Sequence, residues 1–584
     1  MKMGVLFLLT LSPLILWIWV TYFVGKKTPK NYRPFTPQPI NRPLGDNRTQ
    51  RFSQTKIPKR IDHIIIGSGI SGLSCATALA KNGKSILVLE QHDIAGGSIH
   101  VFPEFGVEFD TGLHYVGNIK KRMPLLNFLG DFPIEWQQMG SEDNWIFDRF
   151  FIGDKEYYSR AGEENLIQDL LLDFPAEEEN LVRYIQDIKK YAQKDLFFHI
   201  KIVSEWLRFI LSKFCCREFF QRAQMSSYQY VSEYTSNEKL KEVLCALSID
   251  GGPPPRKQSA FIHISIVNHF LNGGFYPKGS PKVITQSLIR TIERSGGRVL
   301  TEATIEQICI KQGRVVGITL VNGTFIPCSS VISSAGVPNT VKLLPEPEKH
   351  DKVLQDIPST ITYFFLYAVA DGIAKDLGLK SCNIWAWPDK PFDQVIEEFE
   401  QDPFNADPVV FIASSSAKDP TWEERYPGKS VVEVISWATS SMFPDEAKPM
   451  KRSEEYEHKK KILEEKMFKY LYKHYPKLKG KILSYSTATP STVKYYLGSH
   501  NGACYGMDAN LLRFGDYPEL RPGTRIKGFY MSGQDNTTLG FTGAFMSGII
   551  TANKVEGYGT ILDILMGREL TNDQMQMRKS RRQV

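Results

Sequence analysis

The sequence predicts an α/β protein with a parallel sheet at its centre. Residues 61–90 have the pattern of a strand, a glycine-rich turn, a helix and a second strand. Residues 297–320 alternate as two hairpin strands do, and residues 529–553 return to the order strand, turn and helix. With 584 residues the chain is too long for one hydrophobic core, so we expect two or more domains.

The turn of the first unit has the spacing of a phosphate-binding loop. Residues 61–66 are apolar and β-branched, as in a buried parallel strand, and Gly67, Gly69 and Gly72 follow them. The first glycine allows a tight turn, the second lets a pyrophosphate approach the backbone, and the third lets the helix pack closely on the strand. The free N–H groups at the start of a helix over residues 71–82 favour phosphate binding.

A carboxylate ends the second strand of this unit. Glu90 closes the strand predicted over residues 85–90, roughly 20 residues beyond the glycines, which is the spacing of an acid that accepts ribose hydroxyls. The unit is therefore predicted to bind NAD or FAD. An ordinary βαβ unit with a glycine-rich turn would explain the turn but not Glu90.

A second glycine pair, Gly96-Gly97, favours the larger of these cofactors. It offers another place where backbone can approach a ligand, and polar and aromatic groups follow it in the segment 109–115. A domain that binds only NAD has no particular need of this turn, whereas a larger and more deeply buried cofactor can use it.

Composition and charge exclude several classes of function. Hydrophobic residues make up 42% and charged residues 23% of the chain, an ordinary globular balance. The net charge of +7 comes from scattered residues, and no nucleic-acid motif is present. The eight cysteines have neither metal-site spacing nor the pattern of a disulfide framework.

The N-terminus is predicted to anchor the protein in a membrane. Residues 3–24 carry no charge and reach the length of about 20 residues that crosses a bilayer. A cleaved signal peptide is the alternative, but this run is longer than its apolar region and no small-residue cleavage site follows. The basic residues 26–33 place the body in the cytosol, whereas the sequon at Asn47 would matter only in a lumenal body.

Together these segments resemble the all-trans-retinol 13,14-reductase (retinol saturase) family, whose wider relatives are the carotenoid isomerases and phytoene desaturases. The resemblance lies in residues 61–117, NHFLNGGFYPKGSPKVITQSL from Asn268, SAKDPTWEERYPG from Ser416, GACYG from Gly502 and GFYMSGQDNTTLGFTGAFMSGIITA from Gly528. In one departure, this chain has Ser98 and Ile99 where those proteins often have two cysteines. The departure bears on substrate and regiochemistry rather than on a backbone-made cofactor site.

The resemblance implies a two-domain FAD-dependent oxidoreductase with a Rossmann-like FAD domain and an inserted α+β substrate domain. Ile305 would meet the adenine through its backbone, Asp535 would contact the ribityl or pyrophosphate portion, and the helix after Gly543 would point at the flavin ring. The full set of implied FAD-binding residues is Gly67, Ser68, Gly69, Gly72, Glu90, Gln91, Gly96, Gly97, Ile305, Gly533, Asp535 and Gly543.

The implied reaction is the saturation of a C=C bond in a lipophilic polyene such as all-trans-retinol. The flavin would carry the hydride, and a reduced nicotinamide, NAD(P)H, or another donor would supply the electrons. A proton donor is also needed, and His114, Tyr115 and His100 are the candidates, with Cys504 and Tyr505 as weaker ones. Each could instead be a hydrogen-bonded structural group near the cofactor.

The expected domain organisation follows from these assignments. The segment 196–220 is amphipathic, and it could rest on a membrane beside a substrate entrance or form a core helix. The predicted parts are an anchor or signal segment 1–25, a linker 26–60, FAD-domain parts 61–150, 256–345 and 496–565, a mostly helical insertion 151–255, a substrate domain 346–495 and a basic tail 566–584.

Rival functions remain open at this point. The chain could be a carotenoid desaturase or isomerase, an amine oxidase, or a non-enzymatic lipid carrier of the same general architecture, although such carriers lack the full glycine fingerprint. We expect a polyene ligand and a membrane, in the endoplasmic reticulum, as partners. Neither nucleic acid nor a specific protein partner is expected.

Overall fold

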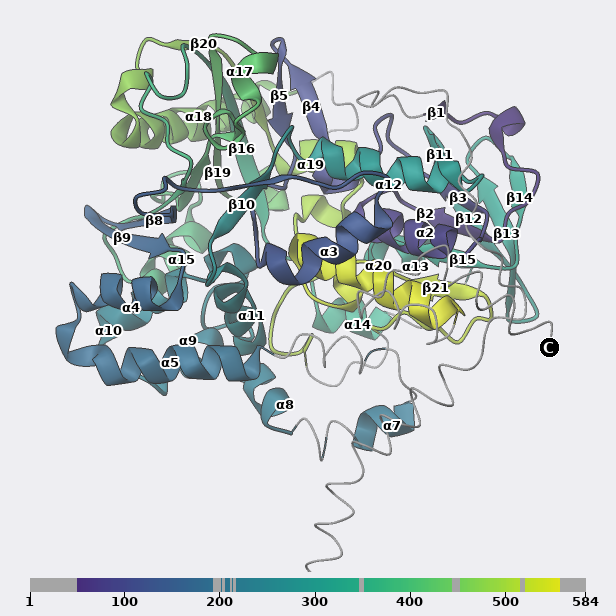
Figure 1. The fold of residues 1–584 in the computed structure, drawn as a ribbon, viewed down its shortest axis with the longest axis horizontal. Helices are drawn as coiled ribbons and strands as arrows, with labels where there is room; N and C mark the ends of the chain where they lie inside the picture. Colours follow the sequence, from purple (N-terminus) through teal and green to yellow (C-terminus); the bar gives the residue numbers. More distant parts are fainter. Residues whose placement is uncertain are drawn as a thin grey trace, which may run out of the picture.

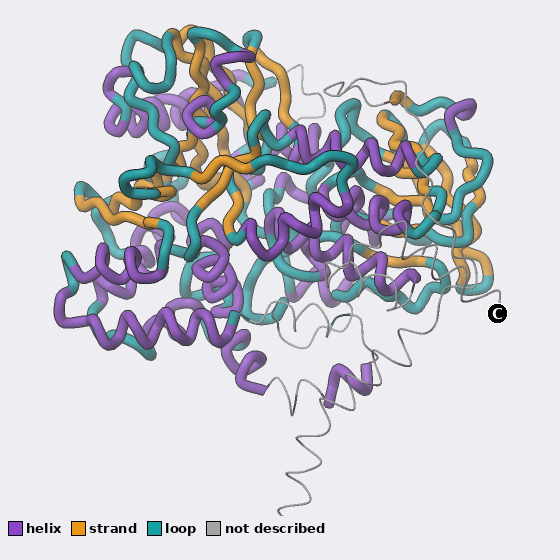
Figure 2. The backbone as a smooth tube through the Cα atoms, in the orientation of Figure 1, coloured by secondary structure: helices purple, strands orange, loops and turns teal. Residues whose placement is uncertain are grey.

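The structure is a computed structural model that describes residues 50–192, 201, 205–210, 213, 217–345, 351–443, 452–514 and 520–556. The predicted anchor, residues 26–49 of the linker, most of the segment 196–220 and the basic tail lie outside these residues. The end of the predicted linker is part of the fold, because Gln50–Arg51 pairs with the strand Arg298–Thr301. Among the helices that are described, none combines the length and the apolar character needed to span a bilayer. Figure 1 and Figure 2 show strands gathered in two groups, with helices around each.

A six-stranded parallel sheet forms the first group, in the order β1-β11-β3-β2-β15-β21. Alternate side chains of each strand enter opposite cores, as Ile64 and Ile65 of β2 do. The strands are β1 (Gln50–Arg51), β2 (His63–Ile66), β3 (Ile86–Leu89), β11 (Arg298–Thr301), β15 (Val331–Ser333) and β21 (Phe529–Met531).

Helices cover one face of this sheet and a β-meander covers the other. The predicted hairpin is confirmed, with Gln312 and Gly313 at positive φ in its turn, and a third strand extends it. The helices are α2 (Ile70–Lys81), α3 (Ile119–Leu129), α12 (Lys282–Arg294) and α20 (Gly540–Glu556); the meander is β12 (Ile305–Lys311), β13 (Arg314–Leu320) and β14 (Phe325–Pro327). Short helices α13 (Val337–Lys342) and α14 (Asp351–Asp356) follow β15.

A seven-stranded mixed sheet forms the second group, in the order β20-β16-β19-β18-β17-β8-β9. Two distant segments of the chain form this one sheet, since β8 of the first segment pairs in parallel with β17 of the second. β8 begins inside the range 61–150 assigned above to the FAD domain. The strands are β8 (Ile146–Ile152), β9 (Lys155–Arg160), β16 (Thr362–Asp371), β17 (Asn383–Trp387), β18 (Val410–Ala413), β19 (Lys429–Ala438) and β20 (Ile482–Ala488).

Helices of both insertions, together with one helix from the range 256–345 assigned above to the FAD domain, pack on the outer face of this sheet around the largest core. They are α4 (Glu163–Leu171), α5 (Glu178–Tyr191), α9 (Ser227–Ser232), α10 (Glu238–Ala246), α11 (Ala260–Phe270), α15 (Phe392–Gln401) and α18 (Glu454–His474). Short helices that lie elsewhere are α7 (Glu205–Ile210), α8 (Arg217–Ala223), α16 (Ser415–Lys418), α17 (Trp422–Arg425) and α19 (Pro490–Leu497); α17 and α19 contribute to the core on the inner face of this sheet.

Two small sheets join the groups. The hairpin β4 (Val101–Glu104) and β5 (Val107–Asp110) packs on the inner face of the seven-stranded sheet. The second small sheet has the order β6 (Val116–Gly117), β10 (Gly274–Pro277), β7 (Trp136–Gln138).

A buried carboxyl group also bridges the two groups. Asp148 of β8 accepts hydrogen bonds from the Tyr115 hydroxyl (3.0 Å), in the loop after β5, and from the Asn383 amide (2.8 Å) in β17. Burial raises the pKa of Asp148 to about 7, although both hydrogen bonds act to lower it. The desolvation cost of the ionised form therefore outweighs the support that the two hydrogen bonds give to it.

We predict that Asp148→Asn removes a pH dependence of stability. The folded-state pKa lies above the 3.8 of an unfolded chain, so the stabilisation is complete below 3.8 and is lost as the pH rises through 7. The difference between the two pKa values corresponds to roughly 4 kcal/mol. The variant should melt close to the wild type at pH 5 and above it at pH 8, as measured by differential scanning fluorimetry. Asp143→Asn, at an exposed loop position, is the control, and an Asp148→Asn effect that is equal at both pH values would contradict the prediction.

Candidate functional site

Both glycine-rich turns line one cavity of about 1810 Å³. Gly67 and Gly69 line it from the turn after β2, and Gly533 and Asp535 line it from the turn after β21. The strands β2 and β21 both pair with β15. Because parallel strands end at a common edge, two turns that are far apart in the sequence meet there.

The first turn leaves its middle glycine open to the cavity. Gly67 has φ +91°, a conformation that favours glycine, and a Cβ at Gly72 would stand 2.2 Å from the Gly67 carbonyl oxygen. A Cβ at Gly69 would meet nothing within 4 Å. The spacing therefore serves two purposes: Gly72 permits close packing within the protein, and Gly69 leaves room for a ligand.

Ser68 and Glu90 hold the first turn to the second glycine pair. Glu90 accepts hydrogen bonds from the Ser68 N–H (2.9 Å) and hydroxyl (2.6 Å) with one oxygen, and from the His92 N–H (3.0 Å) with the other. The Gly96 N–H donates to the Ser68 hydroxyl at 3.0 Å. Glu90 nevertheless lines the cavity, so its carboxylate both fixes the turn and can accept a further donor from a ligand.

Asp535 fastens the second turn to two other segments. Its carboxylate oxygens accept the N–H groups of Val337 (2.8 Å) and Met507 (2.9 Å). A Cβ at Gly506 would lie 2.2 Å from one of these oxygens, so only glycine fits beside it. Helix α20 begins at Gly540, earlier than the predicted start after Gly543, and Gly543 packs against the Thr538 carbonyl.

The cavity separates the predicted FAD-binding residues into two groups. Those that line it are Gly67, Gly69, Glu90, Gln91, Gly97, Ile305, Gly533 and Asp535. The remaining four, Ser68, Gly72, Gly96 and Gly543, are buried behind its wall. Motif spacing alone therefore cannot distinguish the residues that contact a ligand from the buried residues that position them.

The other end of the cavity is aromatic. Strands of the seven-stranded sheet supply its wall, and Phe365 and Tyr367 stack in parallel at 5.9 Å between ring centroids. The aromatic lining residues of these strands are Tyr363, Phe365, Tyr367, Trp385, Phe411 and Trp437. None of them was predicted from the sequence, although the recurring aromatic residues along β16 were a usable signal.

His100, His114 and Tyr115 all line the cavity, but their environments differ. Nδ1 of His100 lies 2.5 Å from the Gly97 carbonyl, and burial lowers the pKa of His100. Burial also raises the pKa of Tyr115 well above its ordinary value, and its hydroxyl already donates to Asp148. Nδ1 of His114 lies 3.0 Å from a carboxylate oxygen of Glu433.

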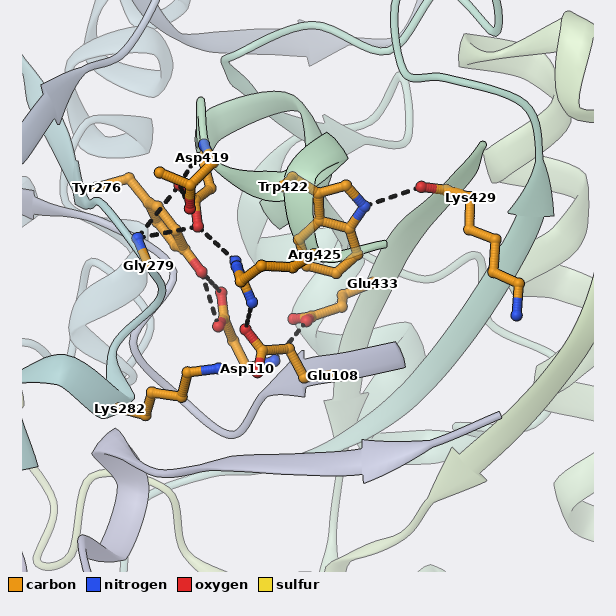
Figure 3. Close-up of polar contacts among 11 residues, drawn as sticks. Glu108, Asp110, Tyr276, Gly279, Lys282, Asp419, Trp422, Arg425, Lys429 and Glu433 are labelled. Atoms are coloured by element: carbon orange, nitrogen blue, oxygen red, sulfur yellow. Dashed lines mark hydrogen bonds and ion pairs between the residues drawn. The ribbon is translucent and has the colours of Figure 1, made fainter. Parts of the chain in front are cut away.

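A buried charge cluster behind His114 was not predicted from the sequence. Asp110, Lys418 and Glu433 come from β5, α16 and β19, and each is at most 2% exposed. Figure 3 shows the carboxylates of Asp110 and Glu433 close together, with the Tyr276 hydroxyl donating to both oxygens of Asp110 at 2.8 and 2.9 Å. A charged residue inside the apolar strand β19 was the available signal.

Solved structures of related architecture confirm the fold predicted for the chain. Cyclohexylamine oxidase from Brevibacterium oxydans superposes with a TM-score of 0.55 at 15% identity, over 87% of this chain and 99% of that one. At this identity the likeness concerns the fold alone.

Sequence comparisons identify the family. Residues 70–555 match the family described as flavin containing amine oxidoreductase, which confirms a flavin cofactor. The all-trans-retinol 13,14-reductase of Danio rerio is 32% identical over 558 residues, which cover 89% of this chain and 90% of that protein. A Danio rerio protein named inactive all-trans-retinol 13,14-reductase is 28% identical over 91% of this chain and 92% of its own. The chain therefore belongs to the flavin-containing amine oxidoreductases, in the family of the all-trans-retinol 13,14-reductases.

Proposed function

We propose that the protein is an FAD-dependent reductase that saturates a C=C bond of a lipophilic polyene, converting all-trans-retinol to all-trans-13,14-dihydroretinol. The observation that carries the proposal is the single cavity with phosphate-binding turns at one end and aromatic rings at the other. Its volume of about 1810 Å³ exceeds the roughly 300–1,000 Å³ of a pocket for one small molecule. A dinucleotide and a polyene can therefore lie in it side by side.

The glycine turns and their neighbours would hold the FAD. Gly69 leaves open space at the N-terminus of α2, where free N–H groups favour the pyrophosphate. Glu90 and Gln91 would meet the adenosine ribose, and Ile305 the adenine. The N-terminus of α20, where Phe541 and Ala544 line the cavity, would stabilise negative charge on the reduced ring. When bound, the flavin supplies the hydride.

The electrons would come from a reduced nicotinamide, NAD(P)H, or from another two-electron donor. The substrate is lipophilic, so a protein held at a membrane meets it where it is concentrated. Residues 3–24, which lie outside the described residues, are the proposed anchor, and we place the protein at the endoplasmic reticulum membrane with its body in the cytosol.

His114 is the favoured proton donor among the candidates. Tyr115 holds its proton firmly, because burial raises its pKa, and a neutral His100 has Nδ1 directed to a carbonyl oxygen. His114 contacts the aromatic end of the cavity, with its ring centroid 5.5 Å from that of Phe411, and its Nδ1 is directed at Glu433. Its other ring nitrogen, Nε2, is therefore the one that can deliver a proton to a carbon atom of the polyene.

Oxidation of an amine is the second candidate reaction, because the family that matches residues 70–555 is described by it. The two reactions use the flavin in opposite directions. An amine would reduce an oxidised flavin, whereas a polyene would oxidise a reduced one.

We predict that Gly69→Ala and Gly72→Ala fail in different ways. The methyl group of Gly69→Ala enters open space, so the apoprotein should melt as the wild type does while FAD affinity falls roughly tenfold to a hundredfold, because overpacking costs about 1–3 kcal/mol. Gly72→Ala places its methyl group against the Gly67 carbonyl and should lower the melting temperature itself. Flavin titration and apoprotein melting test this. Unchanged FAD affinity in Gly69→Ala would remove the turn from the cofactor site.

We predict that the anaerobically reduced protein is reoxidised by all-trans-retinol. The oxidised flavin absorbance bands should return, and chromatography should find all-trans-13,14-dihydroretinol in equal amount. Primary amines added to the oxidised protein should leave its bands unchanged. Bleaching by an amine, together with no reaction with retinol, would favour the oxidase over the reductase.

A further inference from the structure

We propose that Glu433 and Lys418 are positioning residues that hold His114 as the proton donor, Glu433 through the imidazole ring and Lys418 through the backbone. The inference deepens the proposed function and rests on it for the identity of the reaction. Neither residue lines the cavity, so both act on a substrate only through His114.

Glu433 is placed to orient the imidazole ring. One of its carboxylate oxygens lies 3.0 Å from Nδ1 of His114, and the other accepts the Asp110 N–H at 2.9 Å. Glu433 lies at the centre of β19, and its carboxylate is held by the backbone of Asp110 in β5, so both the backbone and the head of this side chain are fixed. A carboxylate beside Nδ1 favours a proton on that nitrogen and stabilises the imidazolium form of the ring, and in that form Nε2 also carries a proton that can be delivered into the cavity.

Lys418 holds the backbone of the same residue. Its ammonium group donates to the His114 carbonyl at 3.1 Å and lies about 6 Å from the ring centroids of Tyr115 and Tyr276. Burial lowers the pKa of Lys418 to about 8, while the charges of Asp110 and Glu433 act to raise it. A buried ammonium group of this kind is tolerated because two carboxyl groups face it.

The groups around His114 can reach charge neutrality without an added ion. Burial, followed by the charge of Glu433, raises the pKa of Asp110 well above its ordinary value, so Asp110 can keep a proton beside Glu433. One ammonium group and one carboxylate then balance while the ring of His114 is neutral, and the imidazolium form adds one positive charge. The titratable groups that face this network are Glu108, Asp110, Tyr115, Asp148, Tyr276, Cys382, Lys418 and Glu433.

The segment 416–428, one of those that carry the family resemblance, accounts for the placement of Lys418. Asp419 accepts the Gly279 N–H at 3.1 and 3.2 Å and the Arg425 guanidinium at 2.6 Å. Arg425 also pairs with Glu108 on β5, as Figure 3 shows. These contacts bind α16 to β5 and to the turn after β10. Lys418, at the end of α16, and His114, in the loop after β5, are thereby held in a fixed relative position.

The proton transfer balances with a hydride supplied by the reduced flavin. A bound reduced flavin would supply the hydride, with its two electrons, to one carbon of the C=C bond. The Nε2 proton of a His114 imidazolium adds to the other carbon, so that two C–H bonds replace the π bond and His114 becomes neutral. A nicotinamide or another two-electron donor would then restore the two electrons.

A double-mutant cycle separates positioning from general damage. Reduced proteins are mixed anaerobically with all-trans-retinol, and the single-turnover rate of flavin reoxidation is measured. We expect His114→Gln to lose roughly a hundredfold or more. Glu433→Gln should lose on the order of tenfold, because the carboxylate charge beside Nδ1 of His114 is gone.

The double variant should be no slower than His114→Gln, and Lys418→Met should behave as Glu433→Gln does. Retinol affinity and reoxidation by ferricyanide, which needs no proton donor, should stay unchanged. Asp131→Asn, which breaks a separate ion-pair cluster with Arg290 and Arg294, is the matched control. Additive losses in the double variant would overturn the inference.

A second measurement needs no substrate. Diethyl pyrocarbonate modifies imidazole nitrogens, and mass spectrometry follows its reaction at His114, with the exposed His458 as internal reference. Modification of His114 should slow several-fold in Glu433→Gln, because the carboxylate no longer activates the ring. Equal rates would overturn the inference even in a protein that reduces retinol. A slower rate in a protein that does not reduce retinol would support the inference and refute the proposed reaction.

Discussion

Close contact between α2 and α20 is the constraint on which the cofactor site depends. A Cβ at Gly548 would lie 2.0 Å from the Ser74 hydroxyl and 2.3 Å from the Ser71 carbonyl, so no larger residue fits between the helices. The Ser71 and Ser532 hydroxyls are 2.6 Å apart, and the Ser74 hydroxyl donates to the Phe545 carbonyl at 3.1 Å. Small residues therefore bring two helix N-termini from opposite ends of the chain to one cavity. If the two helices were further apart, the two glycine-rich turns could not contact the same ligand.

The two sheets are held together by buried charged side chains, whereas α2 and α20 are brought together by small residues. Two acidic residues of β5 have different partners. The Asp110 carboxylate accepts the Tyr276 hydroxyl while its N–H donates to Glu433, and Glu108 pairs with Lys282 and Arg425. Ionic groups are expensive to bury unless each has a partner, so the arrangement tolerates little sliding of one sheet against the other. The aromatic wall and the glycine turns thus keep a fixed separation.

Local patterns predicted the parts of the fold that are local in sequence. The order β2, turn, α2, β3 and the turn between β12 and β13 followed from periodicity and glycine placement, because each is decided by a few adjacent residues. The cavity lining could be predicted only in part. His114 contacts Glu433 and Lys418 across more than 300 positions of sequence, and only the packing of the sheets brings these residues together. The same limit applies to segments 151–255 and 346–495, whose strands join one sheet.

The size of the cavity has a consequence for the life of the protein in a cell. A chain with about 1810 Å³ of ligand space gives up the packing that side chains would otherwise provide there. Ligands that bind only the folded chain return that stability, by about 2.7 kcal/mol when free ligand is a hundred times its dissociation constant. Protein without its ligands would therefore populate the unfolded state more often, and proteases act on that state. Loss of the ligands would then lower the amount of folded chain as well as its activity.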